Sequence, residues 1–134
     1  MIKTIWEDES LIVIDKPVGV VVHEGAGETE STVVDWLLGK YPNLQKLAWP
    51  DPSRPGIVHR LDKDTAGLML LAKNPEILVK LQEQFQKRKI EKTYLALVAG
   101  KVEPKQGKIE AAIGRHPQRR RQMAIRYLSS SASK

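Results

Sequence analysis

The chain has 134 residues, with 22 Lys and Arg against 16 Asp and Glu, and a formal net charge of +6. This length suits one domain, and 41% apolar with 28% charged residues is typical of a folded globular protein. The absence of cysteine excludes disulfides, thiolate catalysis and Cys-based zinc sites. No apolar run approaches the roughly 20 residues of a membrane span. No signal-peptide pattern begins the chain either, so we expect a cytoplasmic protein without membrane contact.

The positive charge is concentrated near the end of the chain. Residues 1–100 carry 13 basic and 14 acidic side chains, whereas residues 101–134 carry 9 basic and 2 acidic ones. Clustered arginines with few acids are typical of contact with phosphate. A solvated, partly disordered basic tail is the alternative interpretation.

Two short strands and a helix are predicted in the first 40 residues. Residues 10–14 form a β-branched run that predicts a buried strand, and residues 19–22 predict a second strand. Ser31 is a candidate N-cap for the helix, which we expect to close at Gly39.

The middle of the chain predicts a loop, a strand and a longer helix. Residues 41–56 contain four prolines and therefore predict an irregular connection. Residues 66–72 are apolar at odd and even positions alike, which is typical of a strand covered on both faces. Asn74 is the candidate cap of a helix with Pro75 at its first position and an apolar stripe that reaches Phe85.

Three more strands are predicted in the last third, over residues 93–98 and 108–113 and from residue 122 to residue 125. Strands in neighbouring pairs, with helices between some of them, predict an α+β fold with a mixed, mainly antiparallel sheet flanked by helices. We expect one domain over residues 1–125 and a low-complexity tail over residues 126–134.

Several common sites are excluded by their spacing. Gly100 and Gly107 are separated by six residues, whereas a phosphate-binding P-loop needs four. The glycines of residues 25–27 lack the third glycine of a dinucleotide-binding fingerprint. The three histidines are far apart and form no HExxH pair, so we expect no metal site.

Residues 54–73 concentrate charged side chains between the irregular loop and a predicted strand. A sheet fixes a carboxylate at its edge, which makes Asp62 a candidate functional group. An aspartate carboxylate is ionised at neutral pH and needs no activating base to act as a nucleophile. Arg60 and Lys63 flank it and would neutralise nearby phosphate. The alternative interpretation is structural: Asp62 and Asp64 would be turn or cap residues without a role in chemistry. A two-carboxylate glycosidase is disfavoured because these aspartates are too close along the chain.

Residues 54–73, R-P-G-I-V-H-R-L-D-K-D-T-A-G-L-M-L-L-A-K, resemble the catalytic signature of the RluA-type pseudouridine synthases. The one departure is Ala66, where Ser or Thr is usual. Three further stretches match the same family in the same order: residues 11–23, 92–98 and 113–124. The resemblance implies the N-terminal portion of a pseudouridine synthase catalytic domain.

The resemblance implies isomerisation of uridine in RNA, without a metal or another cofactor. The N1–C1′ glycosidic bond breaks, the uracil turns, and it rejoins the sugar through C5. Asp62 stands at the position of the family's catalytic carboxylate, so the resemblance implies this role for it. Three modes of action are open to the carboxylate: attack on the sugar, attack on the base, or assistance of elimination. Tyr94 is implied to stack on the uracil, although an ordinary sheet aromatic is the alternative. Arg60 is implied to contact the backbone or fill the gap left by the extruded uridine. His59 is expected to support the pocket rather than act as a general base.

The implied partner is RNA, with ribosomal RNA of the large subunit favoured and transfer RNA as the alternative. Contacts with phosphate are expected from basic side chains, namely Lys16, Lys63, Arg115, Arg119, Arg120 and Arg121. The family's catalytic domain continues beyond position 134 and supplies there an arginine that pairs with the catalytic aspartate. A truncated, non-catalytic RNA-binding fragment or pseudoenzyme is therefore the alternative function.

Overall fold

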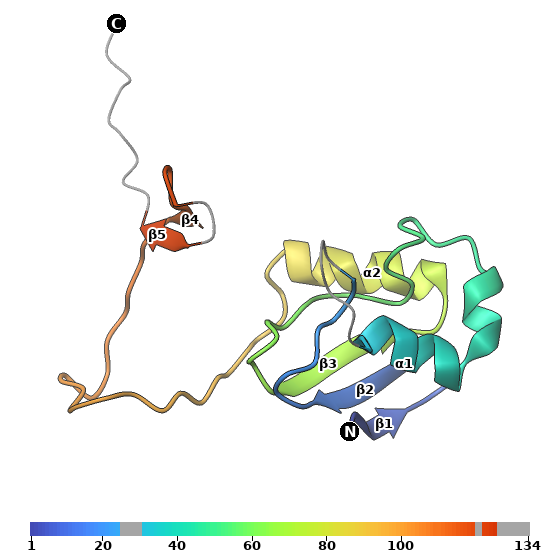
Figure 1. Ribbon diagram of the computed structural model, residues 1–134, viewed down its shortest axis with the longest axis horizontal. Helices are drawn as coiled ribbons and strands as arrows, with labels where there is room; N and C mark the ends of the chain where they lie inside the picture. Colours follow the sequence, from blue (N-terminus) through green and yellow to red (C-terminus); the bar gives the residue numbers. More distant parts are fainter. Residues whose placement is uncertain (25–30, 120–121, 126–134) are drawn as a thin grey trace, which may run out of the picture. The chain divides into compact units, whose positions relative to one another are not determined.

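In the computed structural model of the protein, the described residues are 1–24, 31–119 and 122–125. The chain divides into two compact units, Met1–Thr93 and Tyr94–Lys134. The first unit contains an antiparallel three-stranded sheet of order β1-β2-β3, together with two α-helices and a 3₁₀ helix. Figure 1 shows α1 and α2 lying over this sheet. The elements of the unit are β1 (Lys3–Glu7), β2 (Leu11–Lys16), α1 (Val33–Lys40), η1 (Pro42–Lys46), β3 (Gly67–Ala72) and α2 (Pro75–Gln86).

The central strand β2 directs its even-numbered side chains into the core. Ile12 lies opposite Leu71 of β3, and Ile14 lies opposite Met69. All four side chains are fully buried and pack with apolar residues of both helices. Lys16 follows in the same alternation and is also fully buried, because every second residue of a strand faces the same side.

Side-chain caps fix the beginnings of both α-helices. Asn74 accepts a hydrogen bond from the Ile77 amide at 2.9 Å, and Pro75 occupies the first turn, which confirms the predicted start of α2. In α1 the cap is Thr32, whose hydroxyl accepts from the Asp35 amide at 3.1 Å. The Asp35 carboxylate accepts from the Thr32 amide in return, forming a capping box. The prediction of Ser31 as the cap is wrong by one residue.

The second unit contains a short antiparallel pair, β4 (Ile113–Arg115) and β5 (Met123–Ile125). The His116 amide donates to the Gln122 carbonyl at 2.9 Å and extends this pairing toward the connecting turn. The strand predicted to begin at residue 122 is confirmed, one residue later. The tail predicted over residues 126–134 lies outside the described residues.

The α+β fold with antiparallel sheets is confirmed, but the structure corrects several elements. Residues 19–22 form no strand, because their backbone bonds elsewhere: the Val21 and Val22 carbonyls accept from the first amides of α1. Residues 93–98 are irregular and exposed, and within the described ranges no neighbouring strand satisfies their backbone. Residues 108–112 are likewise irregular. The strand predicted at residues 66–72 is confirmed as β3. The prediction that both faces of this strand are covered is wrong, because the side chain of Leu68 is 64% exposed.

Candidate active site and nucleotide pocket

Asp62 lies in an exposed turn directly before β3. The preceding residues run back along β3, since Ile57 forms an antiparallel bridge with Leu71 and the Ala72 amide donates to the Gly56 carbonyl. The chain then reverses, and the Thr65 amide donates to the Asp62 carbonyl at 3.1 Å. Residues 54–72 therefore form a hairpin-like segment with the exposed Asp62 near its turn.

Lys16 anchors this turn from the interior of the protein. Its Nζ donates hydrogen bonds to the carbonyls of Pro17, Val20 and Lys63, at 3.0, 2.8 and 3.2 Å. The Gly19 amide also donates to the Lys63 carbonyl, at 2.8 Å. Two donors thus hold the peptide between Lys63 and Asp64, one residue after Asp62.

Burial lowers the pKa of Lys16, while the nearby carboxylates of Asp64 and Asp62 oppose this shift. The ammonium therefore lies within electrostatic range of both aspartates of the turn. The prediction that Lys16 contacts RNA phosphate is wrong, because its side chain is fully buried and its donors are directed to backbone carbonyls. Its contribution to the site is structural and electrostatic.

His59 is held by a hydrogen bond and by ring stacking. Its Nε2 accepts from the Leu70 amide at 3.1 Å, and its ring stacks on Phe85 with centroids 4.5 Å apart. A ring nitrogen that accepts a hydrogen bond carries no proton, so the imidazole is neutral with its proton on Nδ1. Burial, followed by the charge of Lys92, lowers the pKa of His59 and favours this neutral form.

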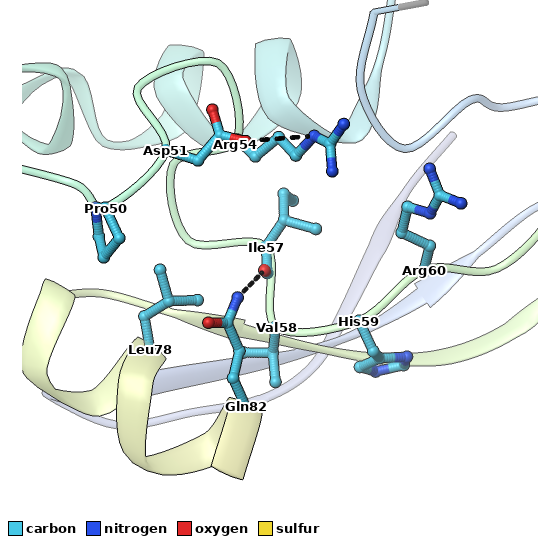
Figure 2. A pocket seen from close by; sticks show the side chains of 9 residues that line it. All are labelled: Pro50, Asp51, Arg54, Ile57, Val58, His59, Arg60, Leu78 and Gln82. Atoms are coloured by element: carbon cyan, nitrogen blue, oxygen red, sulfur yellow. Dashed lines mark hydrogen bonds and ion pairs between the residues drawn. The ribbon is translucent and has the colours of Figure 1, made fainter. Parts of the chain in front are cut away.

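A pocket of about 410 Å³ opens between the 50–60 segment and α2. Arg60 and His59 both line it, so the structure brings together two of the three residues expected to form a base pocket. Asp62 does not line it. Figure 2 shows the lining side chains, which are Pro50, Asp51, Arg54, Ile57, Val58, His59, Arg60, Leu78 and Gln82.

Sequence analysis singles out none of three polar residues of this pocket, namely Asp51, Arg54 and Gln82. The Arg54 Nε lies 3.5 Å from the Asp51 carboxylate. The Gln82 side-chain amide donates to the Ile57 carbonyl at 3.2 Å. Arg54 opens the recognisable motif, which is a signal that sequence analysis could have used. Gln82 lies in the helix after the motif, and only the packing of α2 brings it to the pocket.

The remaining predicted site residues lie in different parts of the chain. Lys63 is exposed in the same turn as Asp62. Tyr94, which is 62% exposed, begins the second unit, and Arg115 and Arg119 belong to that unit as well. The predicted RNA contacts of these four residues stay predictions. Two further predicted contacts, Arg120 and Arg121, lie outside the described residues.

Neither a metal site nor a membrane-spanning helix is found in the part of the chain that the structure describes. No three His, Asp or Glu side chains there are grouped so that they would hold a metal ion. The helices there are too short or too polar to cross a membrane.

Comparison with known proteins shows the family of the chain. Residues 10–133 match the family described as RNA pseudouridylate synthase. The chain belongs to this family. It is 48% identical over 124 residues to the ribosomal large subunit pseudouridine synthase D of Nitrosomonas europaea. The matched residues make up 92% of this chain and 34% of that protein. It is 46% identical over 125 residues to an RNA pseudouridine synthase of Aquifex aeolicus, covering 93% of this chain and 39% of that protein.

A solved structure is also similar to the chain. The human RNA pseudouridylate synthase domain containing 4 matches with 34% sequence identity and a TM-score of 0.47, over 65% of this chain and 30% of that one. The chain therefore spans only about a third of the length of the relatives that it matches.

Proposed function

We propose that the chain takes part in converting uridine to pseudouridine in RNA, with Asp62 as the catalytic carboxylate. Membership of the family supports the reaction, and the names of several relatives favour ribosomal RNA of the large subunit as the substrate. That substrate implies action in the cytoplasm, where ribosomes are. Transfer RNA is the alternative substrate.

The observation that carries the assignment of Asp62 is its position. The side chain is exposed, while the backbone beside it is fixed by the two donors on the Lys63 carbonyl. A reacting group held by a rigid element loses less freedom when the substrate binds, which favours catalysis. The ammonium of Lys16 lies within electrostatic range of both aspartates of the turn.

The other residues have supporting roles in this proposal. Uridine must leave the base stack before its N1–C1′ bond is reached, and this extrusion costs a few kcal/mol. Arg60 is exposed near the turn and contacts the backbone or fills the gap left in the stack. Tyr94 stacks on the released uracil while it turns and rejoins through C5. Lys63, Arg115 and Arg119 bind phosphates without reading sequence.

The test is to map pseudouridine in a transcript of large-subunit ribosomal RNA after incubation with the chain. We expect product with the wild-type chain and none above background with Asp62→Asn. The matched control is Asp64→Asn, which removes the same charge from the same exposed turn and keeps product formation. A transfer RNA transcript in parallel distinguishes the two substrate classes. RNA binding without product would instead support a non-catalytic RNA-binding function.

A further inference from the structure

The pocket between the 50–60 segment and α2 has an apolar floor. Ile57, Val58 and Leu78 line it and are 4%, 6% and 2% exposed, and Pro50 completes the apolar part. Its volume of about 410 Å³ lies in the range in which proteins bind small molecules. A flat, weakly polar group such as a nucleobase would bury its faces against these side chains.

Two arginines supply positive charge on one side of the same pocket. Figure 2 shows the guanidinium groups of Arg54 and Arg60 on the same side of Ile57. Arg54 is paired with the Asp51 carboxylate at 3.5 Å, whereas the Arg60 guanidinium has no ion-pair partner among the described residues. Two guanidinium groups against one carboxylate leave a net positive charge, which suits a phosphate.

His23 lies near the two arginines but does not line the pocket itself. Its Nδ1 is buried and has no hydrogen-bond partner among the residues that the structure describes. Burial lowers the pKa of His23, and the charges of Arg54 and Arg60 lower it further, so the imidazole lies within electrostatic range of both. His23 is therefore a buried neighbour of the two arginines and is not one of the residues placed against the nucleotide.

Acceptors for the edge of a base are present as well. Gln82 donates to the Ile57 carbonyl through its amide nitrogen, so its side-chain oxygen stays available as an acceptor. The Asp51 carboxylate lies on the wall of the same pocket. A nucleotide combines an anionic phosphate, an apolar base face and a polar base edge, and the pocket provides a counterpart for each. A free phosphate would leave the apolar floor unused.

We propose that this pocket binds a second nucleotide of the RNA substrate, with its phosphate on Arg54 and Arg60 and its base over Ile57 and Leu78. The nucleotide differs from the uridine that reacts, because Asp62 does not line the pocket. This inference rests on the proposed function for the identity of the RNA, but the pocket itself is testable without catalysis.

The experiment titrates the full chain with uridine 5′-monophosphate and adenosine 5′-monophosphate, followed by two-dimensional NMR. Inorganic phosphate and the nucleosides uridine and adenosine are the comparison probes. We expect the mononucleotides to shift the signals of the Gln82 side-chain amide and of the Ile57 and Val58 amides. Each comparison probe should bind more weakly, because it lacks either the phosphate or the base.

Variants show which residues hold the nucleotide. Arg60→Gln and Arg54→Gln should each raise the mononucleotide Kd about tenfold or more, since each loses a charge-assisted contact. Lys46→Gln removes one positive charge from the exposed end of η1 and should change the Kd less than twofold. Because Arg60 is exposed and makes no ion pair among the described residues, its variant should keep the wild-type spectrum.

Asp62→Asn separates the pocket from the proposed catalysis. We expect this variant to bind mononucleotides as the wild type does, even though it forms no pseudouridine. If Asp62→Asn kept full activity, the assignment of Asp62 as the catalytic carboxylate would fail while the pocket would stand. Three results would each overturn the pocket proposal. The mononucleotides could shift only NMR signals from outside the pocket, or the Arg60→Gln variant could bind them with an unchanged Kd. The third result is that inorganic phosphate binds as tightly as a mononucleotide.

Discussion

Replacing Lys16 with methionine tests the buried ammonium that anchors the Asp62 turn. Lys16 donates to the carbonyls of Pro17, Val20 and Lys63 over 2.8 to 3.2 Å, and its side chain is fully buried. Methionine is a similarly long, unbranched side chain that fills the space but donates no hydrogen bond. The carbonyls of Pro17 and Val20 lose this donor, whereas that of Lys63 keeps the Gly19 amide.

The cost follows from the groups that lose their partner. A buried polar group left unsatisfied costs about 1–3 kcal/mol, so two part-buried carbonyls give a loss of at most about 2–6 kcal/mol. Removing the ammonium also removes the penalty for burying its charge, which offsets part of this loss. We therefore expect Lys16→Met to lower the free energy of unfolding by about 2–3 kcal/mol, a large fraction of the typical 5–15 kcal/mol of a domain.

Urea unfolding followed by tryptophan fluorescence measures this loss, with the buried Trp49 as an internal probe of the first unit. The control is Lys46→Met, which changes an exposed lysine and should shift the unfolding free energy by less than about 0.5 kcal/mol. If Lys16→Met were as stable as the wild type, or more stable, the interpretation of Lys16 as an anchor would be refuted.

Three further predictions concern stability. Gly56→Ala should cost about 2–4 kcal/mol in thermal unfolding, because at φ +71° its Cβ would lie 2.7 Å from a backbone oxygen. Gly19→Ala, with φ +82° and no atom within 4 Å, should cost only about 1 kcal/mol, and equal losses would contradict the steric argument. Glu7, whose lysine contacts hold its pKa at about 2, contributes stability above pH 4.5 that is lost as pH falls toward 2. Glu7→Gln should therefore flatten the acid side of the stability curve, and an unchanged slope would contradict this. His59→Leu leaves the Leu70 amide without its acceptor and should cost about 1–3 kcal/mol in urea, whereas a neutral effect would show that the hydrogen bond is unimportant.

The elements that the sequence predicts well are those whose signals are local. The cap at Asn74, the proline after it and the apolar stripe lie within one short stretch, and α2 begins where they indicate. The apolar runs of β2 and β3 likewise predict strands without knowledge of their partners. Sequence patterns therefore locate these three elements to within about two residues.

The errors arise where the backbone partner is distant in sequence. Residues 20–22 are three valines, but the carbonyls of Val21 and Val22 accept from the first amides of α1 instead of from a strand. Residues 93–98 have the composition of a strand, but β-propensity describes how side chains pack and supplies no neighbouring strand. Strand β1 was missed, because its pairing with β2 could not be inferred from its mixed polar composition.

The candidate site was predictable in part. The motif of residues 54–73 singles out Asp62, Arg60 and His59 as candidates from contiguous sequence alone. The burial of Lys16 had a local signal, because Lys16 continues the even-numbered inward side of β2, but the family resemblance implied a phosphate contact instead. The pocket was not predictable, because α2 and the 50–60 segment supply its walls from separate parts of the chain.

The most direct test of the central claim is the release of the hydrogen at C5 of uridine. Rejoining the uracil through C5 expels this hydrogen, so ribosomal RNA carrying tritium at C5 releases tritium in each turnover. We predict that the wild-type chain and Asp64→Asn release tritium at similar rates, whereas Asp62→Asn releases none above background. Equal release by Asp62→Asn and the wild type would contradict the assignment of Asp62 as the catalytic carboxylate.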